Sequence, residues 1–396
     1  MRIIVLLALC TFSLAYPQKT VELSDYSFEV EQLTDNTFVS FTKKHLENSQ
    51  FVMIGEQHGI KEVGEFTNAL YNIAQPFGYK TLCIETDAVA AKTIQKVAGS
   101  KDPITAAIAI HKEFPFAIPF YNNKDDYTLF TNVIQRKGSI WGIDQTFMVQ
   151  FRMNFDHLIR TTSNDKLKAK LAVLQKDADA AYSQAIGNKN FNDTYIFKYD
   201  ETTHQELLQI ATDPKEQEIL KQLWKTKEIY AYNNLTKEYY KNNNVRGQLM
   251  KRNFINYYNQ ALRKETLPKV IFKLGANHAA KGLTRTNIYD VSNLIHELAI
   301  VNDKKSLHYL VMGISGTVAT GNPFAPNPVV PFDNIKHFPE ELQKIVPTIN
   351  QKYYVLNLQP LRVYGYGDRF SDAFKKVLFA YDFVVLVKDA EAFKSF

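Results

Sequence analysis

Short, nearly continuous apolar runs recur along the chain, and stretches with helical spacing separate them. Such runs are typical of strands that other elements cover on both faces. We therefore predict strands at residues 51–54, 81–84, 139–143, 270–274, 307–312, 353–358 and 383–387. Between the first two, apolar residues recur at helical spacing from Val63 to Ile73, and Pro76 ends that helix. The pattern predicts an α/β fold with a largely parallel central sheet flanked by helices.

Residues from about 150 to 265 break this alternation, because they contain helical periodicity and no predicted strand. We predict a long helical insertion, packed on the sheet, within a single α/β hydrolase-like domain that extends over residues 16–396. The stretch at 316–332, "GTVATGNPFAPNPVVPF", is rich in Gly and Pro. We expect it to be a long loop, of the kind that often acts as a lid or a binding loop.

The first residues have the pattern of a signal peptide. A positive charge at Arg2 precedes the apolar run IIVLLAL at 3–9, and Ser13-Leu14-Ala15 fits a cleavage site with small residues. We predict a signal peptide at 1–15, a mature chain that begins at Tyr16, and export to a periplasm or secretion. The mature chain would then keep a single cysteine, Cys83, which lies in a predicted strand and cannot form an internal disulfide.

Composition and charge exclude some classes of partner. The formal net charge is only +6, and the lysines and arginines are scattered without a basic block. We therefore expect no nucleic-acid partner. Beyond the N-terminal run, no segment is long and apolar enough to predict a transmembrane helix. The partner that we expect is a small-molecule substrate, and the sequence does not predict an oligomeric state.

Polar residues follow four of the predicted strands at the points where the strands end. The strands run into Gly55-Glu56-Gln57-His58-Gly59, Glu85-Thr86-Asp87, Gly142-Ile143-Asp144-Gln145 and Gly275-Ala276-Asn277-His278. In a parallel α/β sheet, ligands bind beyond the carboxyl ends of the strands. Neighbouring strands lie about 4.8 Å apart, so these side chains can meet. The sequence therefore predicts one site at this edge of the sheet.

Each of these residues also has a structural explanation. His58 fits a hydrogen-bonded turn, and Glu85 fits the first turn of the next helix, where acidic residues are favoured. The coincidence of such groups at four strand ends favours a functional site, and histidine is well suited to proton transfer near neutral pH. On a helix after residue 243, Arg246 shares a face with Met250, where it could form a salt bridge or stabilise negative charge.

The motifs IGEQHG, IET, GIDQ, R-x-x-x-M at 246–250 and GANHAAKG occur in this order over about residues 45–290. In that order they resemble the erythromycin esterase-like family. This family belongs to a wider group, with ChaN-type haem-binding and Tiki/TraB-type proteins, that is marked by paired G-x-x-H motifs. The resemblance implies an α/β fold with helical additions, and in the esterase members of the family the histidine of the first motif activates water for hydrolysis of a macrolide lactone. It assigns water activation to His58, with Glu56, Glu85, Arg246 and His278 around it.

We therefore expect an exported hydrolase, without a cofactor, that attacks an ester or related acyl bond. His58 would be the general base, Glu85 or Glu56 would orient it, and Arg246 and His278 would hold the oxyanion or the substrate. The residues that we expect to contact the substrate are Gln57, Asp144, Gln145, Met250 and Asn277.

Two alternatives remain open. In the first, a metal-dependent hydrolase or peptidase would bind a divalent ion through His58, His278, Glu56 and Glu85. In the second, a non-catalytic protein would bind a ligand such as haem in the same cleft. Turnover of model esters would separate a catalyst from a binding protein, and metal analysis would separate the two enzymes.

Overall fold

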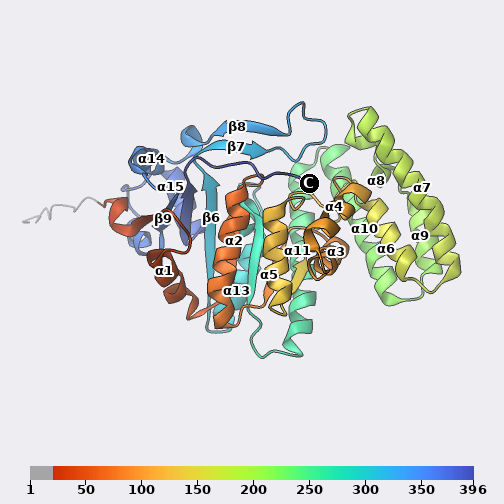
Figure 1. Ribbon diagram of the computed structural model, residues 1–396, viewed down its shortest axis with the longest axis horizontal. Helices are drawn as coiled ribbons and strands as arrows, with labels where there is room; N and C mark the ends of the chain where they lie inside the picture. The colour runs from red at the N-terminus through yellow and green to blue at the C-terminus, as the bar shows by residue number, and fades with distance from the viewer. Residues whose placement is uncertain (1–20) are drawn as a thin grey trace, which may run out of the picture.

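The computed structural model describes residues 21–396, and its centre is an eight-stranded sheet (Figure 1). The strand order is β1-β9-β10-β6-β2-β5-β3-β4. The strands are β1 (Ser27–Val30), β2 (Ser49–Glu56), β3 (Thr81–Ile84), β4 (Ser139–Gly142), β5 (Val270–Gly275), β6 (Lys305–Gly313), β9 (Tyr353–Asn357) and β10 (Phe383–Val387). All seven predicted strands are confirmed. The eighth, β1, is a short edge strand that carries no long apolar run.

The sheet is largely parallel, as predicted. Strands β10, β6, β2, β5, β3 and β4 pair in parallel, whereas β9 is antiparallel to both of its neighbours, β1 and β10. Strand β2 is buried along its whole length, because Val52 and Ile54 face one core and Phe51 and Met53 face another. Burial on both faces explains why the strands appear in the sequence as unbroken apolar runs.

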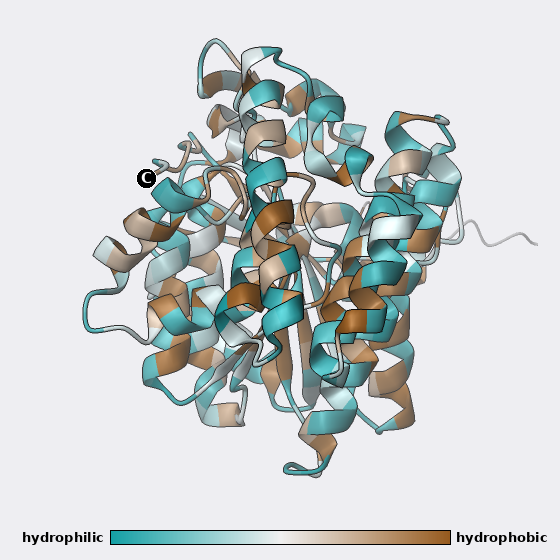
Figure 2. Cartoon of the chain, turned by 90° about the vertical axis from the view of Figure 1, so that its right-hand side faces the viewer, coloured by the Kyte–Doolittle hydropathy of each residue, from teal (hydrophilic) through white to brown (hydrophobic). Residues whose placement is uncertain are grey.

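Helices cover both faces of the sheet, so that apolar strands are enclosed between them (Figure 2). One face is covered by α1 (Asn36–Leu46), α2 (Lys61–Ala74), α3 (Ala88–Ala98), α4 (Pro103–Glu113) and α5 (Lys124–Gln135). The other face is covered by α11 (Tyr239–Leu262), α13 (Val291–Val301), α14 (Glu340–Ile345) and α15 (Asp372–Ala380). The short helix α12 (Ala276–Ala279) follows β5 directly.

The segment between β4 and β5 is helical, and much of it packs on itself. Helices α6 (Phe151–Thr161), α7 (Asp165–Gly187), α8 (Tyr195–Lys198), α9 (Glu201–Ile210) and α10 (Pro214–Asn234) share a core of their own. Figure 1 shows them to one side of the sheet. The prediction that the insertion packs on the sheet is correct for α11, where Phe254 and Tyr258 join the sheet core. The helices before α11 pack mainly on one another, although Met153 of α6 and Ile219 of α10 reach the sheet core.

The prediction of a structureless loop at 316–332 is wrong. Strands β7 (Ser315–Ala319) and β8 (Val329–Asp333) form an antiparallel hairpin, and 320–328 is its loop. Glycine and proline hid the pairing, since the two-stranded sheet has only edge strands and an edge strand tolerates a proline such as Pro331. The loop reaches the helical segment, where the rings of Phe324 and Phe191 lie 4.4 Å apart (Figure 1).

Within residues 21–396, no helix has the length and apolar character needed to cross a membrane. The predicted signal peptide at 1–15 and the predicted mature N-terminus at Tyr16 lie outside the described residues. Cys83 lies in the core, where burial raises the pKa of its thiol well above the usual value.

Candidate active site

Four parallel strands deliver the predicted residues to one edge of the sheet. Glu56 ends β2 and His58 follows it, Glu85 follows β3, Asp144 follows β4, and His278 lies on α12 after β5. These strands are neighbours in the order β2-β5-β3-β4, so their carboxyl ends lie side by side. The structure therefore brings together side chains that are far apart in the sequence.

His58 is fixed on two sides. Its Nδ1 lies 2.6 Å from Oε1 of Glu56, and its ring stacks on Phe120 with the ring centroids 3.9 Å apart. Because the carboxylate of Glu56 accepts the Nδ1 proton, the neutral imidazole presents its lone pair at Nε2. Phe120 has a φ of 66°, in the left-handed region that such bulky residues rarely adopt. Backbone strain of this kind is concentrated at functional sites.

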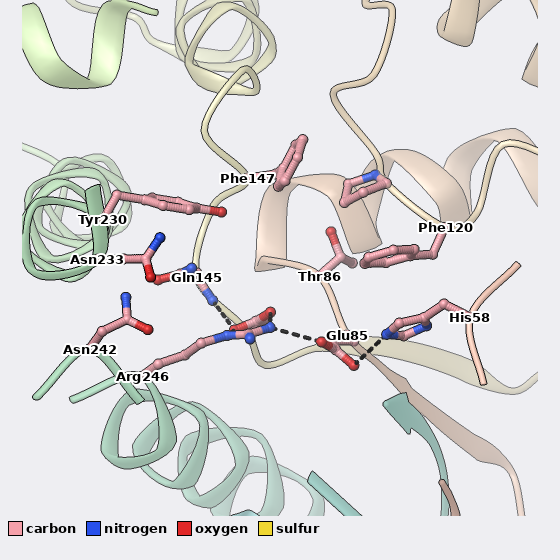
Figure 3. A pocket seen from close by; sticks show the side chains of 12 residues that line it. His58, Glu85, Thr86, Phe120, Gln145, Phe147, Tyr230, Asn233, Asn242 and Arg246 are labelled. Carbon is pink, nitrogen blue, oxygen red and sulfur yellow. Dashed lines mark hydrogen bonds and ion pairs between the residues drawn. The ribbon is translucent and has the colours of Figure 1, made fainter. Parts of the chain in front are cut away.

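Glu85 links the other residues to His58. Its Oε1 accepts a hydrogen bond from Nη2 of Arg246 at 2.8 Å and lies 3.5 Å from Nε2 of His278. Its Oε2 accepts from the backbone N–H of Gly275 at 2.5 Å and lies 3.8 Å from Nε2 of His58 (Figure 3). A Cβ atom at Gly275 would lie 3.0 Å from Nε2 of His58, so the second G-x-x-H glycine leaves room for the imidazole.

Arg246 reaches the site from α11 and binds two carboxylates. Its Nε and Nη2 donate to Oδ1 and Oδ2 of Asp144 at 2.9 and 2.5 Å, in the bidentate geometry that arginine favours. The bond to Glu85 uses Nη2 as well. Among residues 21–396 no acceptor is hydrogen-bonded to Nη1, which leaves this group free to donate to a bound molecule.

These contacts set the protonation states. Burial by itself would lower the pKa of His58, but the hydrogen bond and charge of Glu56 and the charge of Glu85 outweigh it, and the pKa is raised. Burial also opposes protonation of His278, yet Glu85 and Asp290 raise its pKa to about 10. Burial would raise the pKa of Glu85, but His278, His58 and Arg246 hold it well below the usual value. At neutral pH, His278 is a cation and Glu85 an anion.

The sequence analysis missed a second layer of charged groups. Lys273 is buried in β5, where its Nζ lies 2.7 Å from Oε2 of Glu56 and 3.2 Å from Oδ1 of Asp126. Asp290 lies 2.8 Å from Nδ1 of His278. A single lysine inside the apolar run VIFKL is a signal that could have been used. Nothing in the sequence around Asp290 marks it, because its partner is brought near only by the fold.

Three predicted substrate contacts lie elsewhere. Gln57 accepts hydrogen bonds from Gly313 N–H and from Asn334 Nδ2, so it ties the strand end to the hairpin. Met250 is fully buried in the sheet core, on the side of α11 that faces the strands. Asn277 is exposed on α12 and is not part of the cavity wall. Met250 and Arg246 do lie on the same helix, α11. Only the long arginine side chain reaches the cavity, whereas Met250 is buried in the sheet core.

A cavity of about 340 Å³ lies above these residues. His58, Glu85, Asp144, Gln145 and Arg246 contribute to its wall, together with Thr86, Pro119, Phe120, Phe147, Tyr230, Asn233 and Asn242 (Figure 3). Glu56 and His278 lie behind this surface and act on it through His58 and Glu85. The arrangement places a neutral or protonated imidazole, a carboxylate and a guanidinium at the floor of a space that fits a small molecule.

The four residues of the metal alternative do not form a metal-binding group. Within residues 21–396, no three His, Cys, Asp or Glu side chains are grouped as such a site requires. The carboxylate between the two histidines, that of Glu85, is already bound by Arg246 and the backbone of Gly275. Glu85 is paired with Arg246 and His278, and Glu56 is paired with Lys273, so protein side chains supply the positive charge beside these carboxylates.

The fold is the mixed α/β fold of the erythromycin esterase-like type, with a largely parallel sheet flanked by helices. No family model and no curated protein sequence matches the chain. Solved structures do share the fold, and the first is a protein from Bacillus cereus. It is 15% identical, with a TM-score of 0.59 over 94% of this chain and 97% of that one.

A structure described as a succinoglycan biosynthesis protein is 12% identical, with a TM-score of 0.59 over 94% of this chain and 96% of that one. The erythromycin esterase EreC, solved as a mutant in its open conformation, is also 12% identical. Its TM-score is 0.57 over 91% of this chain and 95% of that one. At such identities the similarity shows the fold alone.

Proposed function

We propose that this protein is an exported hydrolase of the erythromycin esterase-like family. It cleaves an ester or related acyl bond with a water molecule that His58 activates. The observation that carries the proposal is the state of His58, whose Nδ1 is held at 2.6 Å by Glu56 while its side chain lines the cavity. The esterase fold and the ordered motifs support the family, and the pattern of residues 1–15 supports export.

In the reaction, Nε2 of His58 takes a proton from water as the water oxygen forms a bond to the acyl carbon. The electron pair of the carbonyl double bond moves to the oxygen, and Nη1 of Arg246 donates a hydrogen bond to this oxyanion. The carbonyl re-forms as the bond to the leaving oxygen breaks. His58 returns its proton to that oxygen, so the products are an acid and an alcohol.

The supporting residues have separate roles. Glu56 keeps the proton of neutral His58 on Nδ1, and the 2.6 Å contact supports Glu56 rather than Glu85 as the orienting group. Glu85 lies 3.8 Å from Nε2 and stabilises the imidazolium that forms when water is deprotonated. Asp144 holds the guanidinium of Arg246 in place by two hydrogen bonds.

The test is a set of model esters with short acyl chains, assayed on the protein and on the variant His58→Gln. An amide keeps the size of the side chain but cannot accept the proton, so we expect kcat/KM to fall by about 10²–10⁴-fold. His337→Gln is the matched control, because His337 is exposed and outside the cavity wall. A folded His58→Gln protein with unchanged kcat/KM would exclude His58 as the base.

The same assay separates the metal-dependent alternative. We expect equal rates after exhaustive chelation and after addition of Zn²⁺ or Mn²⁺, because the site residues are bound to one another. Activity that disappears on chelation and returns with one ion would instead favour the metal-dependent hydrolase.

A further inference from the structure

The two sides of the cavity differ in chemistry. The floor, at the strand ends, carries the ionisable groups His58, Glu85 and Asp144. The opposite side carries aromatic rings and side-chain amides, from Tyr230 and Asn233 on α10 and Asn242 on α11 (Figure 3). The floor supplies the reaction, and we expect the opposite wall to hold the part of the substrate that does not react.

The amide of Gln145 has an unused hydrogen-bonding atom. The residue is 8% exposed and lines the cavity, yet its Oε1 is buried without a hydrogen-bond partner. Its backbone N–H donates to Oδ1 of Asp144 at 2.7 Å, so the residue is tied to the floor. A buried acceptor without a donor is costly, and native proteins rarely leave one. A bound molecule that donates a hydrogen bond would satisfy it.

Two further amides also present acceptors. Asn233 donates through Nδ2 to Oδ1 of Asn234 at 2.8 Å, and Asn242 donates through Nδ2 to the carbonyl of Ile229 at 2.7 Å. Each amide uses one of its two N–H donors within the helical segment, and no donor among residues 21–396 is hydrogen-bonded to either Oδ1. The wall therefore offers neutral acceptors to a ligand that carries donors.

The charges of the cavity are already matched within the protein. The guanidinium of Arg246 is bound by Asp144 and Glu85 through Nε and Nη2, so it can offer a substrate carboxylate or phosphate only Nη1 and no bidentate contact. The same bonds, with the Gly275 and Gln145 backbone N–H groups, occupy the carboxylate oxygens that an ammonium group would need. A charged substrate would lose its hydration without gaining a free counterion, so an uncharged substrate is favoured.

We infer that the cavity binds a compact, uncharged ester of a polyol, such as an acylated monosaccharide, whose hydroxyl groups donate hydrogen bonds to Gln145, Asn233 and Asn242. The inference rests on the proposed hydrolase function for turnover, whereas the binding part stands on the wall alone. The rings of Phe147 and Tyr230 contact the apolar C–H groups of such a molecule. A volume of about 340 Å³ is near the lower end for ligand cavities, which limits the substrate to a small polyol.

The experiment compares four acetyl esters by the release of acetate. They are 6-O-acetylglucose, ethyl acetate, acetylcholine and the acetoxyacetate anion, which differ in hydroxyl content and charge. We expect the highest kcat/KM on 6-O-acetylglucose, at least about tenfold above ethyl acetate, because a site with unpaired hydrogen-bonding groups discriminates against analogues that lack the partner. Equal or higher kcat/KM on ethyl acetate, acetylcholine or acetoxyacetate would overturn the inference.

The variant Gln145→Met keeps the length of the side chain and removes the amide. We expect the ratio of kcat/KM on 6-O-acetylglucose to that on ethyl acetate to fall by about tenfold. Gln184→Met is the matched control, since Gln184 is exposed on α7 and is not part of the cavity wall. A Gln145→Met ratio equal to that of the control would also overturn the inference.

A binding measurement keeps the two proposals distinguishable. Calorimetric titration of 6-O-acetylglucose into His58→Gln protein needs no turnover, and we expect binding that weakens about tenfold when Gln145→Met is added. Binding without hydrolysis by the unmodified protein would refute the proposed function and support the polyol site. Hydrolysis of ethyl acetate without detectable binding of 6-O-acetylglucose would refute the polyol site and support the proposed function.

Discussion

Replacement of Lys273 by Met tests the charged layer beneath the site. The ammonium group is 3% exposed and lies between Glu56 and Asp126, which are equally enclosed. Met retains the apolar stem of the side chain but leaves both carboxylates without their cation. It also removes the contact of Nζ with the ring of Tyr121, whose centroid is 4.7 Å away. Removal of one partner from a buried ion pair typically costs about 3–5 kcal/mol of folding free energy.

The matched control is Lys170→Met. Lys170 and Glu206 lie 2.6 Å apart, as close as the buried pair, but Lys170 is only half-buried and Glu206 is exposed to solvent. An exposed pair contributes about 0–1 kcal/mol, so a similar distance should give a much smaller effect. The assay is chemical denaturation of each variant beside the unmodified protein. A shift of the midpoint without a change in the m-value reports a change in the free energy of unfolding.

The difference between the two lysine variants should depend on pH. In the unmodified protein burial would raise the pKa of Glu56, but Lys273 and His58 hold it below the usual value. Its ionised form thus stabilises the fold above about pH 4.3 and loses this contribution as the pH falls further. Without Lys273, Glu56 and Asp126 take up protons more readily, so the penalty should shrink between pH 7 and pH 5. Equal losses for Lys273→Met and Lys170→Met at pH 7 would refute this account.

Three other outcomes are expected. Glu56→Gln removes the charge that raises the pKa of His58, so the acid limb of the kcat/KM profile should move to lower pH. An acid limb at unchanged pH would show that Glu56 does not set the pKa of the catalytic base. His278, with its pKa raised to about 10, should stabilise the fold fully below about pH 6.5 and lose that contribution as the pH rises to 10. Melting of the protein and of His278→Gln across this range measures it, and a constant difference would contradict it. Intact mass of the protein from its native host should correspond to an N-terminus at Tyr16, and a retained Met1 would exclude the cleavage.

The sheet and the floor of the site could be predicted because their signals are local. A strand buried on both faces is apolar throughout, and a polar residue directly after it stands out, as His58, Glu85 and Asp144 do. The hairpin was missed because Gly and Pro obscure the alternation in its edge strands. Asp290 and Phe120 were missed because the sequence does not state which distant segment will face a histidine.

The opposite wall could not be predicted for a similar reason. Tyr230, Asn233 and Asn242 lie on amphipathic helices, where an amide that faces a cavity looks the same as one that faces solvent. Substrate contacts in the sequence were therefore sought beside the strand-end motifs. Of these, Gln145 lines the cavity, whereas Gln57 and Asn277 do not.

Because α6–α10 have a core of their own, the cavity wall that α10 forms is built separately from the sheet edge that carries His58 and Glu85. The strand register and the Lys273–Glu56 ion pair lie in the sheet, outside α10. In evolutionary terms, such a division would let descendants of one ancestor acquire new substrates while inheriting the same reaction. In laboratory terms, it makes position 233, which lines the cavity outside that core, the first choice for randomisation in a search for altered specificity.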